Sequence, residues 1–346
     1  MVRIFSFYIR FHMKKIFFAF LILILLAAGA IYWAKQRIFA PSEMAGWTTF
    51  QVENGSSAVK IGKILESEGL VSNGKLFSWW CRIEKIQLKA GWYDIPPKTS
   101  IASLAQILSS GKTATRKVTI PEGRASWEMP AYFREVLPDF DSTKWESLVH
   151  DAKFAKELGV GAESLEGYLL PDTYPVEFGA TEKDIARQMV RANLKLKSEM
   201  EALQSPLWNE LGGWHQVLTL ASVVEEETGK TDERAMIAGV FVNRLRQGIS
   251  LGADPTVRFI FRNLTGPIYR SQLQSDSPYN TRRFRGLMPG PISNPGRKAI
   301  EATLNPANTD ALFFVAKDDG SGTHFFAKTL SQHNKYKSTA AKNRGE

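Results

Sequence analysis

The sequence predicts an α+β protein with three parts: a single N-terminal transmembrane helix, a small βααβ module and a larger mixed α+β domain. Residues 16–34 contain no charged side chain, and these 19 residues are about the length that a helix needs to cross a bilayer. Short strand-like and helix-like patterns follow up to residue 114. From residue 115 on, longer helical patterns alternate with loops rich in proline and glycine.

The uncharged run at 16–34 is expected to be an uncleaved membrane anchor. More basic residues precede it than follow it, which predicts that residues 1–15 stay in the cytoplasm. Tyr32 and Trp33 stand at its far end, where aromatic side chains favour the membrane interface. The alternative is a signal peptide cut near Ala28-Gly29-Ala30, but the apolar run continues beyond that point. If the chain is bacterial, everything after about residue 35 is therefore expected on the outer, periplasmic or extracytoplasmic side of the cytoplasmic (inner) membrane. The basic residues before the run are Arg3, Arg10, Lys14 and Lys15, and those after it are Lys35 and Arg37.

The composition is that of an ordinary globular protein, with 44% apolar and 23% charged residues. The formal net charge is +9, but four of the positive charges precede the anchor, which weakens a nucleic-acid-binding interpretation. A single cysteine, Cys81, cannot form an internal disulfide or a zinc ribbon. The five histidines show no metal-ligand spacing. We expect no metal and no cofactor.

A linker at 35–46 leads into the small module, which is expected to span 47–114. Its order of strand, helix, helix and strand resembles a LysM-like module, a small fold associated with glycan binding. The alternative is a spacer domain that only packs. The expected elements are a strand at 48–52, a helix capped by Ser57 and stopped at Gly69, a helix at 75–83, a strand at 86–93 and a helix from Ser100 to Gly111.

The larger domain is expected to span 115–334 and to be followed by a basic, disordered tail at 335–346. Thr181 opens a long helix with a capping box, and Thr231 is expected to cap another. The expected elements are a strand at 116–120, helices at 127–136, 181–203, 215–228, 232–247 and 300–304, and a buried strand at 312–316.

One glutamate of the helix at 215–228 falls on its apolar face. On a helical wheel Glu225 lies beside Leu218 and Ala221, whereas Glu226 points to solvent and Glu227 lies at the edge of the apolar arc. Burial favours the protonated form of a carboxyl group, which is the form a general acid needs. The alternative is a structural ion pair, for example with Arg234 or Arg244 on the next helix.

Several short motifs in order resemble the endolytic murein transglycosylases, the MltG or YceG-like family. The resemblance covers roughly residues 48–334, and the N-terminal anchor also fits it. The motifs are Thr119–Gly123 (TIPEG), Leu165–Tyr174 (LEGYLLPDTY), Leu220–Thr228 (LASVVEEET), Ala238–Leu245 (AGVFVNRL), Asp254–Val257 (DPTV), Ser277–Thr281 (SPYNT), Pro289–Ile292 (PGPI) with Asn294–Gly296 (NPG), and Leu304–Pro306 (LNP).

The resemblance implies a membrane-anchored lyase that cuts within the glycan strands of peptidoglycan between N-acetylmuramic acid and N-acetylglucosamine. It implies 1,6-anhydro ends, termination of nascent strands and partnership with peptidoglycan synthases. Its motif assigns the catalytic acid to Glu225. Glu227 matches the second motif glutamate, and either orients Glu225 or only pairs with an arginine. The expected substrate-binding or supporting residues are Glu227, Asn243, Asp254, Tyr279, Asn280 and Thr281.

The chain departs from the family pattern at three places. Gly252-Ala253 stand where the family usually has Gln-Thr, Arg282 where it has an aromatic residue, and Met288 where it has a proline. Two other functions stay open. One is hydrolysis of the same polymer, with Asp254 or Glu227 as the base that activates water. The other is a non-catalytic, membrane-tethered scaffold that binds glycan and synthases.

Overall fold

The computed structural model describes the backbone of residues 2–262 and 264–345, and the side chains from residue 17 on within those ranges. The charges of Arg3, Arg10, Lys14 and Lys15, on which the predicted topology rests, lie outside the described side chains. The predicted α+β class is confirmed. The chain divides into two compact units, Met1–Arg116 with Glu177–Gly179, and Lys117–Val176 with Ala180–Glu346.

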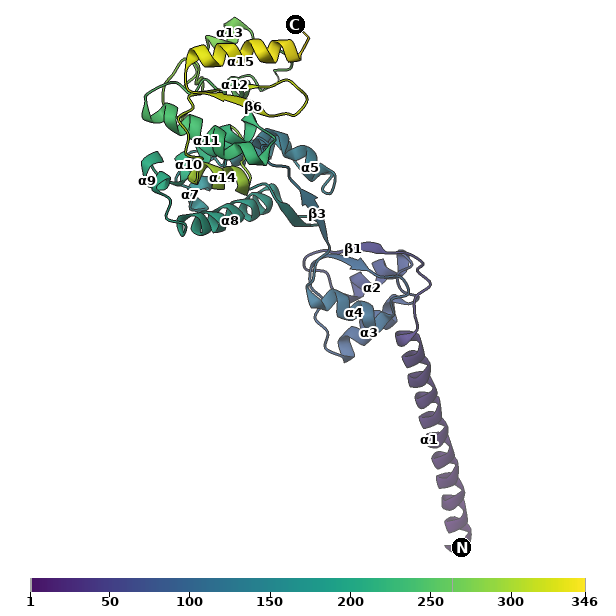
Figure 1. Ribbon diagram of the computed structural model, residues 1–346. Coiled ribbons are helices and arrows are strands. Elements are labelled where there is room, and N and C mark those ends of the chain that lie inside the picture. Colours follow the sequence, from purple (N-terminus) through teal and green to yellow (C-terminus); the bar gives the residue numbers. More distant parts are fainter. Residues whose placement is uncertain (1, 263, 346) are drawn as a thin grey trace. The chain divides into compact units, whose positions relative to one another are not determined.

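Most elements are helices, and short strands stand singly or in pairs between them (Figure 1). Up to the boundary between the units they are α1 (Val2–Phe39), β1 (Thr48–Val52), α2 (Ala58–Ser67), α3 (Gly74–Ile83), β2 (Gly91–Ile95), α4 (Ile101–Ser110) and β3 (Thr115–Thr119). They continue with a 3-10 turn (Ser126–Glu128), α5 (Pro130–Arg134), α6 (Ser142–Val149), α7 (Ala152–Glu157), β4 (Thr173–Glu177), α8 (Glu182–Glu201) and α9 (Pro206–Leu211). The last are α10 (Trp214–Glu227), α11 (Thr231–Arg246), α12 (Asp254–Ile260), α13 (Arg270–Leu273), α14 (Arg297–Leu304), β5 (Phe313–Ala316), β6 (His324–Ala327) and α15 (Leu330–Asn343).

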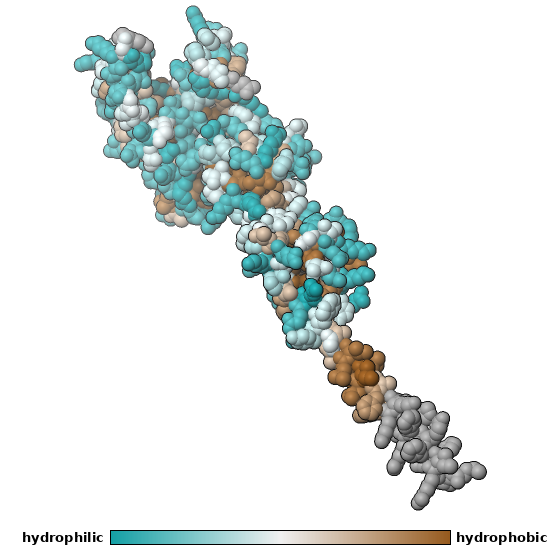
Figure 2. All heavy atoms as spheres, turned by 90° about the vertical axis from the view of Figure 1, so that its right-hand side faces the viewer, coloured by the Kyte–Doolittle hydropathy of each residue, from teal (hydrophilic) through white to brown (hydrophobic). Residues whose placement is uncertain are grey.

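Helix α1 contains the predicted apolar run. Within the described part of the chain, the segment Phe17–Phe39 is the one helix long and apolar enough to cross a membrane. Most of its large apolar side chains are exposed, and Figure 2 shows an apolar surface along this helix, whereas Ile38 is buried in the core of the first unit. These features are compatible with an anchor, and the membrane crossing itself stays a prediction.

The first unit has the predicted order of strand, helix, helix and strand. Strands β1 and β2 pair antiparallel, from Thr48 opposite Ile95 to Val52 opposite Gly91. Ser57 and Ser100 cap their helices as expected. The strand predicted at 86–93 is wrong: the strand begins only at Gly91, because the Lys89 N–H donates to the Leu108 carbonyl, 3.0 Å away, instead of to β1. The relation of this unit to LysM-like modules remains a prediction.

Two glycines let helices α2 and α3 approach closely. A Cβ atom on Gly62 would lie 2.3 Å from the carbonyl oxygen of Gly74, and a Cβ atom on Gly74 would lie 2.1 Å from the carbonyl oxygen of Gly62. Both contacts are with backbone, which cannot rotate away as a side chain can. The core of this unit, which includes Leu65, Phe77 and Leu104, is packed around this crossing.

The second unit is built around α10. Every residue from Val217 to Glu225 is buried, because α10 packs against α9, α11, α12 and α14. Thr181 forms the predicted capping box with Asp184 at the start of α8. The expected cap at Thr231 is wrong: Lys230 holds the cap position of α11 and Thr231 is its first helical residue.

The C-terminal region was predicted least well. The tail predicted to be disordered forms most of α15, because Thr329 caps the helix, Ala340 is buried and α15 packs on β5 and β6. Tyr336 stacks on Phe325 with ring centroids 4.7 Å apart. Strand β6 was not predicted, and β5 is half-buried rather than buried.

The close helix crossing yields a stability prediction. Gly62→Ala should lower the free energy of unfolding by about 2 kcal/mol, because the added methyl group forces α2 and α3 apart. Gly46→Ala is the control: a Cβ atom there meets no atom within 4 Å, so the change should stay within about 0.5 kcal/mol. Urea unfolding of residues 40–346, followed by circular dichroism, measures both. Equal stability of the two variants would contradict the described packing.

Candidate active site

Glu225 lies in the last turn of α10, and its carboxyl group is held on both oxygens. One oxygen, Oε1, forms an ion pair with Nη2 of Arg234 on α11. The other, Oε2, accepts the backbone N–H of Gly296 at 3.0 Å. The side chain is only 5% exposed, so the wheel placed it correctly on the buried face. Of the two ion pairs considered from the sequence, the one with Arg234 is present.

Two effects oppose one another at this carboxyl group. Burial removes it from water and raises the pKa of Glu225, while the Gly296 N–H and the Arg234 guanidinium lower that pKa, and the net direction is upward. Glu122, whose Oε2 lies 3.5 Å from Nη2 of Arg234, shares the same cation. The raised pKa therefore coexists with a buried ion pair, and it makes the protonated form of Glu225 easier to reach than that of an exposed glutamate.

Glu225 lines a cavity of about 490 Å³. Its wall is rich in carboxyl groups: Glu122, Glu128, Glu225, Glu226 and Glu227, with Arg124 and Arg234 as the cations. Gly123 forms part of this wall with φ of +77°, a conformation that favours glycine. A Cβ atom there would lie 2.8 Å from Oε1 of Glu226 and 3.4 Å from Cγ of Glu225. The Pro-Glu-Gly motif thus brings backbone close to the glutamates of α10.

The loop at 289–296 is fastened along α10. His215 bonds to the carbonyl oxygen of Pro289 at 2.9 Å, and the Ile292 N–H donates to the Ser222 hydroxyl at 3.0 Å. The Gly296 N–H reaches Glu225 one turn further on. The proline- and glycine-rich motifs of this loop therefore serve to place one backbone donor on the buried carboxyl group.

Asn294 joins the loop at 289–296 to the segment at Arg124 and to the segment at 166–169. Its amide accepts the Leu169 N–H at 2.9 Å and donates to the Arg124 carbonyl at 3.0 Å and to the Glu166 carboxyl at 2.8 Å. Glu166 also accepts from the backbone N–H and hydroxyl of Ser126, and burial raises its pKa to about 7. Asn294, Leu169, Glu166 and Ser126 are buried, so each of these groups depends on its partner.

Glu226 and Glu227 differ from Glu225 in their surroundings. Glu226 is exposed, as the wheel predicted. Glu227 is half-buried, and within the described part of the chain its carboxyl group makes no ion pair or hydrogen bond. Burial, with Asp254 nearby, raises the pKa of Glu227 to about 7. Of the two alternatives for Glu227, pairing with an arginine is therefore not seen at contact distance among the described residues.

A second cavity of about 360 Å³ adjoins the first and shares Glu226 and Glu227 with it. It contains an aromatic pair, Trp127 and Phe259, whose ring centroids are 5.2 Å apart. The Arg262 guanidinium lies over the Trp127 ring at 4.3 Å, and Asp254 stands on the opposite wall. Aromatic faces beside charged groups are suited to sugar rings and their hydroxyl groups.

The other predicted site residues separate into two groups. Asp254 reaches the cavities, and Tyr279 packs against Phe259 with centroids 4.9 Å apart. Asn280 and Thr281 are buried and bond to nearby loops: Asn280 donates to the Leu273 carbonyl, and Thr281 accepts the Ala253 N–H. The bond between Thr281 and the Ala253 N–H holds the backbone next to Asp254 in place.

Asn243 does not join the cavities. Its amide donates to the carbonyl oxygens of Thr309 and Ala311 and so fastens a loop.

Sequence reasoning missed several cavity residues. Gly296 and Glu122 stood in recognised motifs, yet nothing in the pattern indicated that they would reach Glu225. Trp127 lies more than 120 residues before Phe259 and Arg262, so no local pattern could group the three residues. Within the described residues, no group of three or more histidine, cysteine, aspartate or glutamate side chains is placed to hold a metal ion.

The chain is similar to several characterised sequences. The sequence pattern of the YceG-like family matches residues 50–339. A Bacillus subtilis (strain 168) protein named endolytic murein transglycosylase is 31% identical over 334 residues, covering 90% of this chain and 90% of that protein. A Streptococcus pneumoniae serotype 2 protein of the same name is 29% identical over 364 residues, covering 94% of this chain and 65% of that protein. A crystal structure of a yceG-like protein from Listeria monocytogenes matches with a TM-score of 0.57 and 30% identity, covering 84% of this chain and 98% of that one.

The buried ion pair yields a second stability prediction. Arg234→Ala should lower the free energy of unfolding by about 3 kcal/mol at neutral pH, because Glu225 is left buried without its cation. Arg246→Ala is the control, since Arg246 pairs with Glu210 at the surface, where a salt bridge is worth less than about 1 kcal/mol. Urea unfolding at neutral pH measures both changes. A loss for Arg234→Ala no larger than that of the control would contradict a buried pair.

Proposed function

The chain belongs to the YceG-like family, and from that premise we propose that it is an endolytic murein transglycosylase, a lyase anchored in the cytoplasmic membrane. Its substrate is the glycan strand of peptidoglycan. It cuts the bond between N-acetylmuramic acid and N-acetylglucosamine within the strand and leaves a 1,6-anhydro end.

The observation that carries this proposal is Glu225. It is a buried carboxyl group with a raised pKa at the wall of a cavity, and it stands in the motif that the resemblance assigns to the catalytic acid. A raised pKa keeps more of the group protonated at neutral pH than an exposed glutamate. Arg234 and the Gly296 N–H stabilise the carboxylate that forms once the proton is given away.

In the proposed reaction Glu225 donates its proton to the glycosidic oxygen, which leaves as the 4-hydroxyl of N-acetylglucosamine. The C6 hydroxyl of N-acetylmuramic acid attacks C1 and closes the anhydro ring. The Glu225 carboxylate takes the proton of that hydroxyl, so the enzyme returns to its starting state and no water is consumed. Acid–base catalysis by a positioned group contributes roughly 10²–10⁴-fold to the rate.

The neighbouring cavity supplies a binding surface for the strand. Trp127 and Phe259 offer faces on which sugar rings stack, and Arg262 and Asp254 offer partners for hydroxyl and acetamido groups. This cavity shares Glu226 and Glu227 with the one that Glu225 lines, so a strand lying along both passes the acid.

A second candidate reaction, hydrolysis, is favoured by one specific observation. Glu227 lines both cavities with an unpaired carboxyl group, and Asp254 stands close by, so a base that activates water is available. The product separates the two reactions, because an anhydro end is lighter than a hydrolysed end by one water.

The proposed location follows from helix α1. An anchor at Phe17–Phe39 would hold the enzyme at the outer face of the membrane, where new strands emerge beside the synthases. The small unit between the anchor and the larger unit would bind or guide the strand, as a LysM-like module does. The enzyme would then end the elongation of nascent strands.

Glu225→Gln should abolish strand cleavage and leave the fold intact, because the amide has nearly the same shape but cannot transfer a proton. We expect a loss of at least about 10²-fold in the release of muropeptides from purified peptidoglycan. Mass spectrometry of the wild-type products should show anhydro ends. Glu210→Gln is the control, because its carboxylate pairs with Arg246 at the surface outside both cavities, and it should keep activity near that of the wild type. Activity of Glu225→Gln within tenfold of the wild type would overturn its assignment as the acid.

Deleting the gene should lengthen glycan strands in the cell. Replacing residues 1–34 with a cleavable signal sequence should preserve cleavage in vitro and weaken this control of strand length, since the enzyme would leave the membrane. Chromatography of glycan chain lengths measures both strains. An unchanged length distribution in the deletion strain, with no second enzyme of this type present, would refute the role in ending strands.

A further inference from the structure

A third cavity opens on the far side of Glu227 from Glu225. Its volume is about 650 Å³, larger than that of the cavity at Glu225. Glu227, the last residue of α10, lines both, so the two cavities meet at the end of this helix. None of the steps of the proposed reaction uses this third cavity.

The third cavity is cationic, in contrast to the acidic one at Glu225. Arg244, Arg282 and Lys337 face the carboxyl groups of Asp254 and Glu227. Arg282 is already paired with Asp254, Nη2 to Oδ1 at 2.5 Å. Because the pKa of Glu227 is raised to about 7, part of its negative charge is lost at neutral pH. With Arg282 paired to Asp254, two cations, Arg244 and Lys337, remain in the wall against the single carboxyl group of Glu227.

Arg244 is held in a fixed orientation. Its Nε donates to the Leu312 carbonyl at 2.6 Å, its Nη1 donates to the Leu251 carbonyl, and its guanidinium lies 5.3 Å from the centroid of the Phe313 ring. Among the described residues Nη2 has no partner. A guanidinium fixed on one edge with free donors on the other is suited to a carboxylate.

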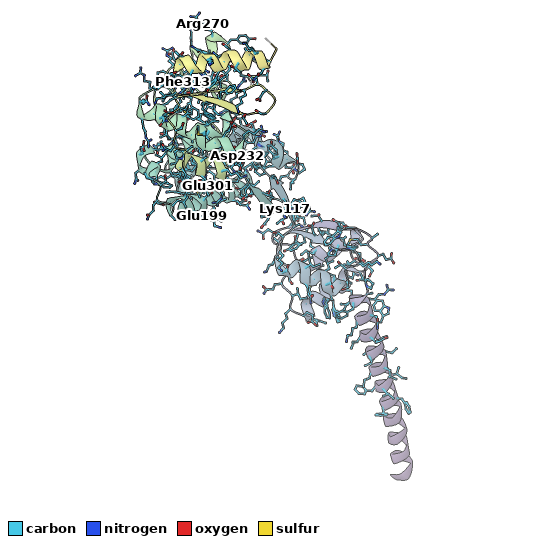
Figure 3. The ribbon with its side chains drawn as sticks, viewed as in Figure 1. Lys117, Glu199, Asp232, Arg270, Glu301 and Phe313 are labelled. Atoms are coloured by element: carbon cyan, nitrogen blue, oxygen red, sulfur yellow. The ribbon has the colours of Figure 1, made fainter. Side chains whose placement is uncertain are left out.

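Helix α15 closes the other side of this cavity. His333 stacks on Phe313, which is labelled in Figure 3, with ring centroids 5.3 Å apart. Its Nδ1 is buried and has no hydrogen-bond partner in the described part of the chain. Lys337 stands one turn further along α15, is exposed, and reaches the same cavity. The cavity wall thus offers two cations, Arg244 and Lys337. It also offers Nδ1 of His333, which has no hydrogen-bond partner, beside the apolar ring of Phe313.

Two departures from the family pattern both line this cavity. Gly252 has no side chain, and a Cβ atom there would lie 3.4 Å from Nη1 of Arg244. Arg282 adds a cation where the family pattern has an aromatic residue. Both differences leave the cavity more open and more positive.

We propose that this cavity is a subsite for the carboxylate-bearing peptide carried by N-acetylmuramic acid, with Arg244 and Lys337 as the residues that receive its carboxylates. The proposal rests on the proposed function. The peptide is attached to the same sugar ring that is cut, so it must leave the cleavage site within a few atoms. A cavity that begins at Glu227, carries positive charge and has Phe313 as an apolar wall suits such a peptide better than it suits neutral sugar.

The test compares two substrates on the full chain in detergent: glycan strands with their peptides, and the same strands after an amidase has removed the peptides. Lys337→Met removes the charge and keeps the length of the side chain. We expect the preference for peptide-bearing strands, measured as the ratio of kcat/KM values, to fall about fivefold. Lys335→Met, an exposed position on the same helix outside the cavity wall, is the control and should leave this ratio unchanged.

A binding measurement tests the proposed subsite independently of strand cleavage. Calorimetry with N-acetylmuramyl pentapeptide as the probe should show binding to the wild type, weaker binding to Lys337→Met and unchanged binding to Lys335→Met. Equal kcat/KM ratios for Lys337→Met and the wild type, or equal pentapeptide binding by these two proteins, would overturn the subsite. If the wild type cuts neither substrate, the proposed function fails, and the calorimetry still supports or overturns the subsite.

Discussion

The arrangement of the site depends on the hydrogen bonds that helix α10 makes with the loop at 289–296. A buried carboxyl group such as Glu225 is tolerated only where fixed donors meet it, and here one donor is the Gly296 N–H. That donor is fixed in turn by Asn294, whose amide bonds to two further loops, and by Ser222 on α10 itself. Loosening any of these bonds would leave several buried polar groups without partners at once.

Much of the fold could be predicted where local physics decides it. The caps at Ser57, Ser100 and Thr181 and the burial of Glu225 followed from short-range pattern. The helix α15 could not be predicted, because Tyr336 and Ala340 are ordered by contacts with β5 and β6 rather than by local propensity. The site was predicted in part: its glutamates stand in one segment, and Arg234 was considered from the sequence as a partner of Glu225. The Gly296 N–H comes from a loop that only the tertiary fold brings to Glu225.

The three cavities that meet at Glu227 differ in character. One is acidic and holds the buried carboxyl group, one carries an aromatic pair, and one is cationic. In the proposed reaction such a division would separate the tasks of proton transfer, ring stacking and charge recognition. Among the described carboxyl groups that line these cavities, only Glu225 combines burial with two fixed partners.

Helix α15 forms one wall of the cationic cavity but takes no part in the network around Glu225. Substitutions at Lys337 or His333 can therefore accumulate without disturbing the buried bonds on which the chemistry depends. The residues that would recognise the peptide could therefore change in relatives of this chain independently of the residues that would cut the strand. Species whose walls differ in peptide composition would be expected to differ first on this helix, and engineering of altered wall specificity would begin there.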